Sequence, residues 1–165
     1  MTDGSADTEA ALSGALPVGA QAPEFELTDQ FGATTRLADF RGDKAVLLVF
    51  YPFSFTGVCT SEMKALQKRI EDFQNDSVQV LGVSCDSAFV QRVFSERERL
   101  SFPVLSDHWP HGATAQQYGV FDDELGAARR GTFVIDTDGV VRWQVLNAIP
   151  NARSSEAYVE ALGAL

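Results

Sequence analysis

The residue with the clearest capacity for chemistry is Cys59, one of only two cysteines in a chain of 165 residues. It ends the stretch "YPFSFTGVC", in which Thr56 stands three positions before it. If Thr56 begins a helix, Cys59 lies in the first turn, where free backbone N–H groups and the positive end of the helix dipole favour a thiolate. The thiolate is the nucleophilic form of cysteine. The spacing alone also fits a small buried thiol behind a threonine cap.

Further residues favour a reactive thiol at this position. Pro52 lacks an N–H group and fixes the path of the chain, while Phe53 and Phe55 can shield the thiol from bulk water. Arg130 directly precedes the apolar segment "GTFVID", and an antiparallel strand there would bring its guanidinium to Cys59. Such a guanidinium would stabilise a thiolate and orient the oxygen atoms of a substrate. Taken alone, Arg130 fits an ordinary surface charge equally well.

The elements that position Cys59 are indicated by runs of apolar residues. "KAVLLVF" at 44–50 and "VQVLGVS" at 78–84 are typical of strands that are covered on both faces. Between them, apolar residues recur at helical spacing at Met63, Leu66, Ile70 and Phe73. A right-handed crossover makes the two strands parallel, so their carboxyl ends share one edge of the sheet. We expect Cys59 at that edge.

The remaining segments complete an α/β pattern. The sequence predicts a hairpin at 24–37, a strand at 102–107, a short helix at 113–120, a hairpin of 131–136 with 140–146, and a closing helix at 154–165. Asp86 or Ser87 can cap a further amphipathic helix, whose expected buried side consists of Phe89, Val90, Val93, Phe94 and Leu100. This order predicts a thioredoxin-like α/β sandwich, in which a central mixed β-sheet is flanked by helices and preceded by an N-terminal β-hairpin.

Composition limits the classes of function. The 45% hydrophobic content suffices for one core, so we expect a domain at 18–165 behind a flexible acidic leader at 1–17. A net charge of −10 argues against nucleic acid and anionic membranes as partners. No apolar run approaches the roughly 20 residues that cross a bilayer, and no basic residues precede an apolar stretch at the N-terminus. These features predict a cytoplasmic protein.

Two segments together resemble the motif of the peroxiredoxins, Pro–x–x–x–Thr/Ser–x–x–Cys plus a distant arginine. They are "PFSFTGVC", with Pro52, Thr56 and Cys59, and "RGTFVID", with Arg130. The resemblance runs from about Val18 to the C-terminus, and segment 102–136 is similar to the one-cysteine alkyl hydroperoxide reductase E branch. It implies a thiol-dependent peroxidase that reduces hydrogen peroxide, organic hydroperoxides or peroxynitrite. Cys59 would become a sulfenic acid, with Thr56, Arg130 and the Cys59 N–H as donors and Pro52 as a shield.

The second cysteine, Cys85, follows the second parallel strand and is the first candidate to reduce a sulfenic acid on Cys59. Many peroxiredoxins instead place the second thiol five residues after the first, where this chain has Lys64. Cys85 also fits a buried thiol without a redox partner. If Cys85 takes no part, the resemblance implies an external thiol reductant, either a low-molecular-weight thiol with a glutaredoxin-like protein or thioredoxin.

Other kinds of activity fit the sequence less well. A disulfide exchanger normally has Cys–x–x–Cys, which is missing after Cys59. Cys59, Cys85, His108 and His111 lack the close-spaced pairs of a zinc site, so we expect neither a metal nor a cofactor. A peroxide sensor or a chaperone-like protein would use the same oxidisable Cys59 without turnover.

The aromatic residues near the expected active edge suggest a homodimer. Near the edge that carries Cys59 we expect three aromatic residues, Phe102, Trp109 and Tyr118. If they are exposed, they would form a dimer face. The same residues also fit a buried core.

Overall fold

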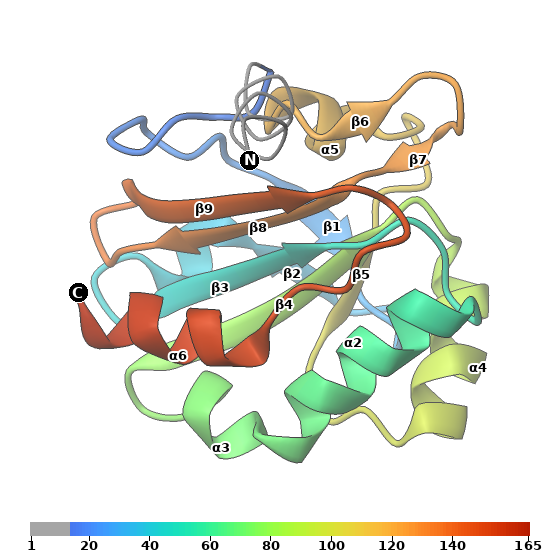
Figure 1. The fold of residues 1–165 in the computed structure, drawn as a ribbon, viewed down its shortest axis with the longest axis horizontal. Coiled ribbons are helices and arrows are strands. Elements are labelled where there is room, and N and C mark those ends of the chain that lie inside the picture. Colours follow the sequence, from blue (N-terminus) through green and yellow to red (C-terminus); the bar gives the residue numbers. More distant parts are fainter. Residues whose placement is uncertain (1–13) are drawn as a thin grey trace, which may run out of the picture.

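The computed structural model describes residues 14–165, whose main feature is a mixed seven-stranded sheet with helices on both faces (Figure 1). The order across the sheet is β2-β1-β5-β4-β3-β8-β9. The bounds are β1 (Glu26–Thr28), β2 (Thr34–Arg36), β3 (Ala45–Phe50), β4 (Val78–Ser84), β5 (Val104–Ser106), β8 (Arg130–Ile135) and β9 (Val141–Asn147). The predicted α/β sandwich with its N-terminal hairpin is confirmed.

The direction of the strands determines which residues meet at the active edge. β3, β4 and β5 run parallel, so their carboxyl ends lie together. β8 runs antiparallel to β3, with Val49 opposite Thr132. The beginning of β8 therefore lies beside the end of β3, and this brings Arg130 to the edge where the chain turns toward Cys59.

Helices and a small hairpin cover the two faces of the sheet (Figure 1). The helical segments are η1 (Leu37–Phe40), α2 (Gly57–Lys68), α3 (Ile70–Phe73), α4 (Ala88–Glu98), α5 (Ala113–Gln117) and α6 (Ser155–Gly163). α2, α3 and α6 lie on one face, whereas α5 and the hairpin of β6 (Phe121–Asp122) and β7 (Ala127–Ala128) lie on the other. Alternate β3 side chains enter two apolar layers, since Leu48 packs on the α5 side and Leu47 packs with Cys59 and Met63.

The helix after Cys59 is shorter than the periodicity predicts. It ends at Lys68, and Arg69 leaves the helical conformation at φ −116° and ψ 31° before the single turn of α3. Ile70 and Phe73 still pack in the layer predicted for them. The apolar spacing therefore located the buried side correctly but did not reveal the break.

The predicted buried side of α4 is correct for Phe94 and Leu100 but wrong for Phe89, Val90 and Val93. Phe89 is 85% exposed and Val93 57% exposed, whereas Gln91 and Phe94 are fully buried. Gln91 occupies the inner face because its amide donates to the Leu105 carbonyl at 2.7 Å and to the Ser84 hydroxyl. Hydrogen bonds thus place a polar residue inside and leave apolar residues outside.

The folded part of the chain begins before Val18. Residues 1–13 of the predicted leader lie outside the described residues. Ala15 belongs to the apolar layer on the α5 side, and the Leu16 N–H donates to the Tyr118 carbonyl at 3.1 Å. For residues 14–17 the predicted flexible leader is therefore wrong.

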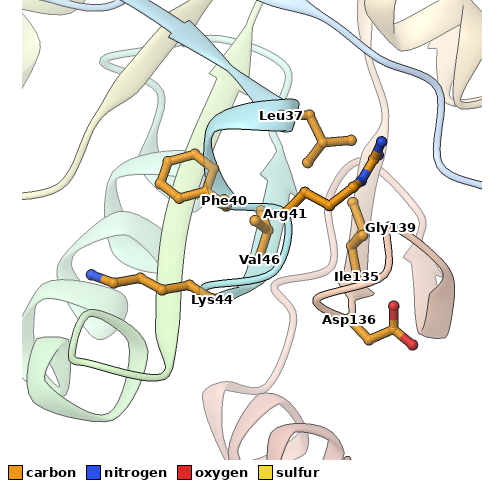
Figure 2. A pocket seen from close by; sticks show the side chains of 8 residues that line it. All are labelled: Leu37, Phe40, Arg41, Lys44, Val46, Ile135, Asp136 and Gly139. Atoms are coloured by element: carbon orange, nitrogen blue, oxygen red, sulfur yellow. The ribbon is translucent and has the colours of Figure 1, made fainter.

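Within residues 14–165, no helix has both the length and the apolar composition needed to cross a bilayer. A cavity of about 10 Å³ lies between η1 and the end of β8 (Figure 2), with Leu37, Val46 and Ile135 among its lining residues. This volume is close to that of one water molecule, so the cavity is too small for a substrate.

Candidate active site

Cys59 lies in the first turn of α2. Thr56 occupies the N-cap position in an extended conformation, and the first helical bond runs from the Thr60 N–H to the Thr56 carbonyl at 2.9 Å. The Cys59 N–H is therefore one of the amino-terminal groups that have no partner within a helix. The Cys59 side chain is 0% exposed, so its sulfur lies in a dry environment in the first turn of the helix, at the positive end of the helix dipole.

Arg130 reaches Cys59 across the end of the sheet. Its Nη1 lies 3.2 Å from the Cys59 Sγ, and its Nε donates to the Ile149 carbonyl. Arg130 is 2% exposed, which excludes an ordinary surface charge. The antiparallel placement of β8 thus brings together two residues that are 71 positions apart.

Glu62 connects Arg130 to the rest of the site. It stands three residues after Cys59 on α2, and its Oε1 accepts a hydrogen bond from Arg130 Nη1 at 2.6 Å. The Glu62 side chain is buried, like that of Arg130. One guanidinium nitrogen therefore contacts both the thiol and a carboxylate, which restricts the orientation of Arg130.

A second buried arginine, Arg153, was not identified from the sequence. Its backbone N–H and Nε both donate to Glu62 Oε2, at 2.7 and 2.8 Å. Its Nη1 donates to the carbonyls of Phe50 and Gly131 and to the Thr132 hydroxyl. Arg153 thus links α2, the end of β3 and the start of β8. It precedes α6 in a polar loop, and no local pattern distinguishes it from exposed arginines.

The charges of this group do not cancel. Burial alone would raise the pKa of Glu62, but hydrogen bonds and charge from Arg153, with a smaller effect of Arg130, lower it below its ordinary value. Glu62 is therefore a carboxylate at neutral pH. Two buried guanidiniums and one buried carboxylate leave one positive charge, and the nearest group that can neutralise it is the Cys59 sulfur.

The stretch before Cys59 differs in part from its predicted arrangement. Thr56 begins α2 as predicted, but within the described part of the chain its hydroxyl accepts no bond from the helix and instead donates to the Phe53 carbonyl at 2.8 Å. Pro52 is buried, directly after Tyr51. Phe53 and Phe55 are 38% and 44% exposed, and they cover the site only partly.

Cys85 is a thiol of a different character. It lies directly after β4, is 7% exposed, and is free, as is Cys59. Burial, with the charge of Asp107, raises the pKa of the Cys85 thiol to about 12. Cys85 is therefore a protonated, weakly nucleophilic thiol at neutral pH.

The remaining candidates from the sequence take other places. Phe102 and Tyr118 are fully buried, so the prediction that they form an exposed face is wrong, whereas Trp109 is 83% exposed. His108 contacts the Cys85 carbonyl and His111 contacts that of Gly126. Across residues 14–165, histidine, cysteine and acidic side chains form no cluster of three or more that would suit a metal.

Comparisons of sequence agree with this geometry. The AhpC/TSA family matches residues 18–144. Over 150 residues the chain is 41% identical to alkyl hydroperoxide reductase E of Mycobacterium tuberculosis (strain ATCC 25618 / H37Rv), covering 91% of this chain and 98% of the relative. It is also 35% identical over 158 residues to the chloroplastic 2-Cys peroxiredoxin BAS1 of Hordeum vulgare, covering 90% of this chain and 74% of the relative.

Solved structures show the same likeness. Peroxidoxin BcpB from Mycobacterium tuberculosis superposes with a TM-score of 0.79 at 32% identity, covering 91% of this chain and 98% of that one. The reduced 2-Cys peroxiredoxin of Plasmodium vivax superposes with a TM-score of 0.81 at 29% identity, covering 89% and 80%. The likeness therefore extends over most of the chain in both sequence and fold.

Proposed function

The chain belongs to the AhpC/TSA family of peroxiredoxins and is a thiol-dependent peroxidase, and we propose that Cys59 is the thiol that attacks the peroxide. The contact of 3.2 Å between Arg130 Nη1 and the buried Cys59 sulfur supports this assignment most directly. The net positive charge of Arg130, Glu62 and Arg153 lies next to that sulfur, where it can stabilise negative charge that develops during the reaction.

The reaction transfers one oxygen atom to sulfur. The Cys59 thiolate attacks an oxygen of ROOH in line with the O–O bond, an S–O bond forms, and the O–O bond breaks. The leaving alkoxide or hydroxide takes up a proton, and Cys59 becomes a sulfenic acid. Sulfur is oxidised and the peroxide is reduced to an alcohol or water. Hydrogen peroxide, organic hydroperoxides and peroxynitrite all contain the required bond.

Donors around Cys59 stabilise the charge that develops along the S–O–O axis. Arg130 carries further N–H groups on Nη2 besides the Nη1 that contacts sulfur, and the Cys59 N–H in the first turn of α2 is a further donor. The Thr56 hydroxyl can donate to a peroxide oxygen after it leaves the Phe53 carbonyl. Pro52 offers no competing N–H and shields the site from water.

An external thiol regenerates Cys59 in this scheme. The sulfenic acid reacts with a thiol to give a mixed disulfide and water, and a second thiol releases Cys59 and a new disulfide. The burial and the raised pKa of Cys85 argue against an internal partner. A low-molecular-weight thiol with a glutaredoxin-like protein, or thioredoxin, is the proposed reductant. This cycle suits the cytoplasm, where such thiols stay reduced.

The protein is proposed to act as a homodimer through apolar side chains beside the active loop. Phe55 packs edge-on against the buried Phe94 of α4 at 5.2 Å between ring centroids, which joins the loop to that helix. The loop and α4 also carry exposed apolar side chains, which we call the α4 face: Phe53, Phe55, Phe89, Val90 and Val93. Covering them with a second copy removes apolar surface from water.

Mass spectrometry of the protein after one equivalent of hydrogen peroxide tests the assignment of Cys59. We expect a gain of one oxygen on the peptide that contains Cys59 and none on the peptide that contains Cys85. A disulfide between the two peptides would contradict the one-cysteine cycle. The sensor or chaperone-like alternative is not favoured, since the relatives are named as reductases and peroxiredoxins.

A further inference from the structure

The closed site raises the question of how a reductant reaches Cys59. Its side chain is 0% exposed. A small peroxide can reach such a buried sulfur more easily than a larger thiol, which must approach the sulfur of the sulfenic acid. The stretch from Pro52 to Thr56 joins Tyr51, which is buried in the same cluster as Cys59, to the first turn of α2. It is therefore the segment next to Cys59 that would have to move for that approach. What holds this stretch closed therefore affects the rate of regeneration. This inference rests on the proposed function of Cys59.

Asp86 makes the contact that fastens this stretch to the sheet. Its Oδ2 accepts a hydrogen bond from the Ser54 backbone N–H at 2.9 Å and another from the Ser84 hydroxyl at 2.7 Å. Ser54 lies midway between Pro52 and Thr56, and Ser84 is the last residue of β4. Bonds to an ionised carboxylate are among the stronger hydrogen bonds in proteins. One oxygen atom thus joins the loop to the central sheet.

The groups on the sheet side of Asp86 are themselves fixed. The Gln91 amide donates to the Ser84 hydroxyl at 2.9 Å and to the Leu105 carbonyl at 2.7 Å. The Ser106 hydroxyl donates to the Asp86 carbonyl at 2.7 Å. β4, β5 and α4 therefore hold the carboxylate in place, and the loop is the partner that can leave.

The loop has one more contact near this point. The Tyr51 hydroxyl lies 3.1 Å from the Ser54 hydroxyl, and Tyr51 is fully buried. This bond joins Ser54 to the residue that follows β3, whose own N–H donates to the Val83 carbonyl of β4 at 3.0 Å. Ser54 is thus held through both its backbone and its side chain, and the backbone bond depends on Asp86.

We propose that Asp86 is a positioning residue that holds the Ser54 segment over Cys59, and that breaking its bond to Ser54 opens the sulfur to thiols. Asp86 itself does not touch the reacting sulfur. Weakening this contact speeds access of a bulky reagent to Cys59 without changing the chemistry of the peroxide step.

The test compares labelling of reduced Cys59 by a biotin-linked maleimide in the wild type, in Asp86→Ala and in Asp76→Ala. Asp76 is an exposed carboxylate in the turn before β4 and is the matched control. In Asp86→Ala we expect Cys59 to be labelled roughly tenfold faster, because a hydrogen bond to a charged group is lost. The Ser54 amide hydrogen should also exchange faster. Asp76→Ala should match the wild type. Unchanged labelling and exchange in Asp86→Ala would overturn the proposal.

A second comparison separates local opening from general destabilisation. Hydrogen exchange of the β3 amides should stay as slow in Asp86→Ala as in the wild type, and a parallel increase at β3 would also overturn the proposal. If Asp86→Ala does not fold, Asp86→Asn keeps an acceptor oxygen but loses the charge, and labelling should rise by a smaller factor of roughly three. Unchanged labelling in that variant counts against the proposal.

These measurements do not depend on peroxidase activity. Failure of Cys59 to react with peroxide would contradict the proposed function but leave the labelling and exchange results in place. If Cys59 reacts with peroxide and Asp86 holds the Ser54 segment, the sulfenic acid of Asp86→Ala should be reduced faster than that of the wild type at equal thiol concentration.

Discussion

Residue by residue, the site depends on a group of charges that are buried together. Arg130 touches the Cys59 sulfur, and Glu62 holds Arg130 by a bond of 2.6 Å. Arg153 adds its backbone and its guanidinium to the same carboxylate. Removing one member leaves a buried charge without its partner, which is far more costly than losing an exposed ion pair.

Replacing Arg130 tests its direct role. We expect Arg130→Ala to lower the second-order rate constant with hydrogen peroxide by roughly 10² to 10³, the usual effect of losing one donor to a developing charge. Arg129→Ala is the control, because Arg129 is only partly buried and its Nε lies 4.0 Å from an Asp122 carboxylate oxygen. Stopped-flow measurement of both variants decides the question, and equal rates in the two would refute the role of Arg130.

The pH dependence of stability should report on Glu62. Its folded pKa lies below the ordinary value of 4.5, so the carboxylate contributes its full stability above about pH 4.5 and loses it as the pH falls through the folded pKa. Glu62→Gln should therefore cost roughly 3–5 kcal/mol at pH 7 and much less in acid. Urea unfolding at several pH values measures this. Exposed Glu71→Gln should follow the wild type, and a pH-independent cost in Glu62→Gln would be the contrary result.

At the scale of the elements, close approaches of the backbone position the segments around the sheet. Gly119 follows α5 with φ +71°, and a Cβ there would lie 1.7 Å from the Gly14 carbonyl oxygen. This glycine lets residues 14–17 pack beside Tyr118, whose ring fills the layer under α5. A side chain at this position would push the N-terminal segment away from the fold.

We expect Gly119→Ala to destabilise the fold by at least roughly 1–3 kcal/mol, the cost of the left-handed backbone alone, with the clash adding to it. Gly163→Ala is the matched control, since nothing lies within 4 Å of its added Cβ at the end of α6. Thermal unfolding of both variants measures the difference. If Gly119→Ala is as stable as Gly163→Ala, the close approach of Gly119 to Gly14 does not contribute to the stability of the fold.

The elements also show which parts of the molecule sequence patterns can predict. The strands at 44–50 and 78–84 were predictable because continuous apolar runs leave few alternatives. The directions of the strands then predicted that Cys59 and Arg130 meet at one edge of the sheet. The side of α4 that is exposed could not be predicted in the same way. Phe89 and Val93 are as apolar as the buried Phe94, and only the packing of the folded chain decides which of them is buried. Arg153 was missed because its burial depends on a carboxylate 91 positions away.

At the scale of the whole molecule, the α4 face remains as apolar surface next to the active loop. Phe89 is 85% exposed and Val93 57% exposed, and they lie on the same helix as Phe94, against which Phe55 packs edge-on. A dimer through this face would place two active loops near each other.

Phe89→Ser with Val93→Ser should convert the proposed dimer to a monomer in light scattering. The stability of the monomer fold should change by less than about 0.5 kcal/mol, because exposed positions contribute little to it. Leu125→Ser is the control, since Leu125 is 46% exposed but lies between β6 and β7 on the other side of the sheet. A wild type that is monomeric at micromolar concentration would contradict the dimer.

The most direct test of the central claim is the rate of peroxide consumption by the wild type, Cys59→Ser and Cys85→Ser with the same excess of a thiol reductant. We predict that Cys59→Ser loses turnover completely while its circular dichroism spectrum stays that of the wild type. Cys85→Ser should turn over at the wild-type rate, because Cys85 is buried and protonated. Turnover that persists in folded Cys59→Ser, or disappears in folded Cys85→Ser, would contradict the mechanism.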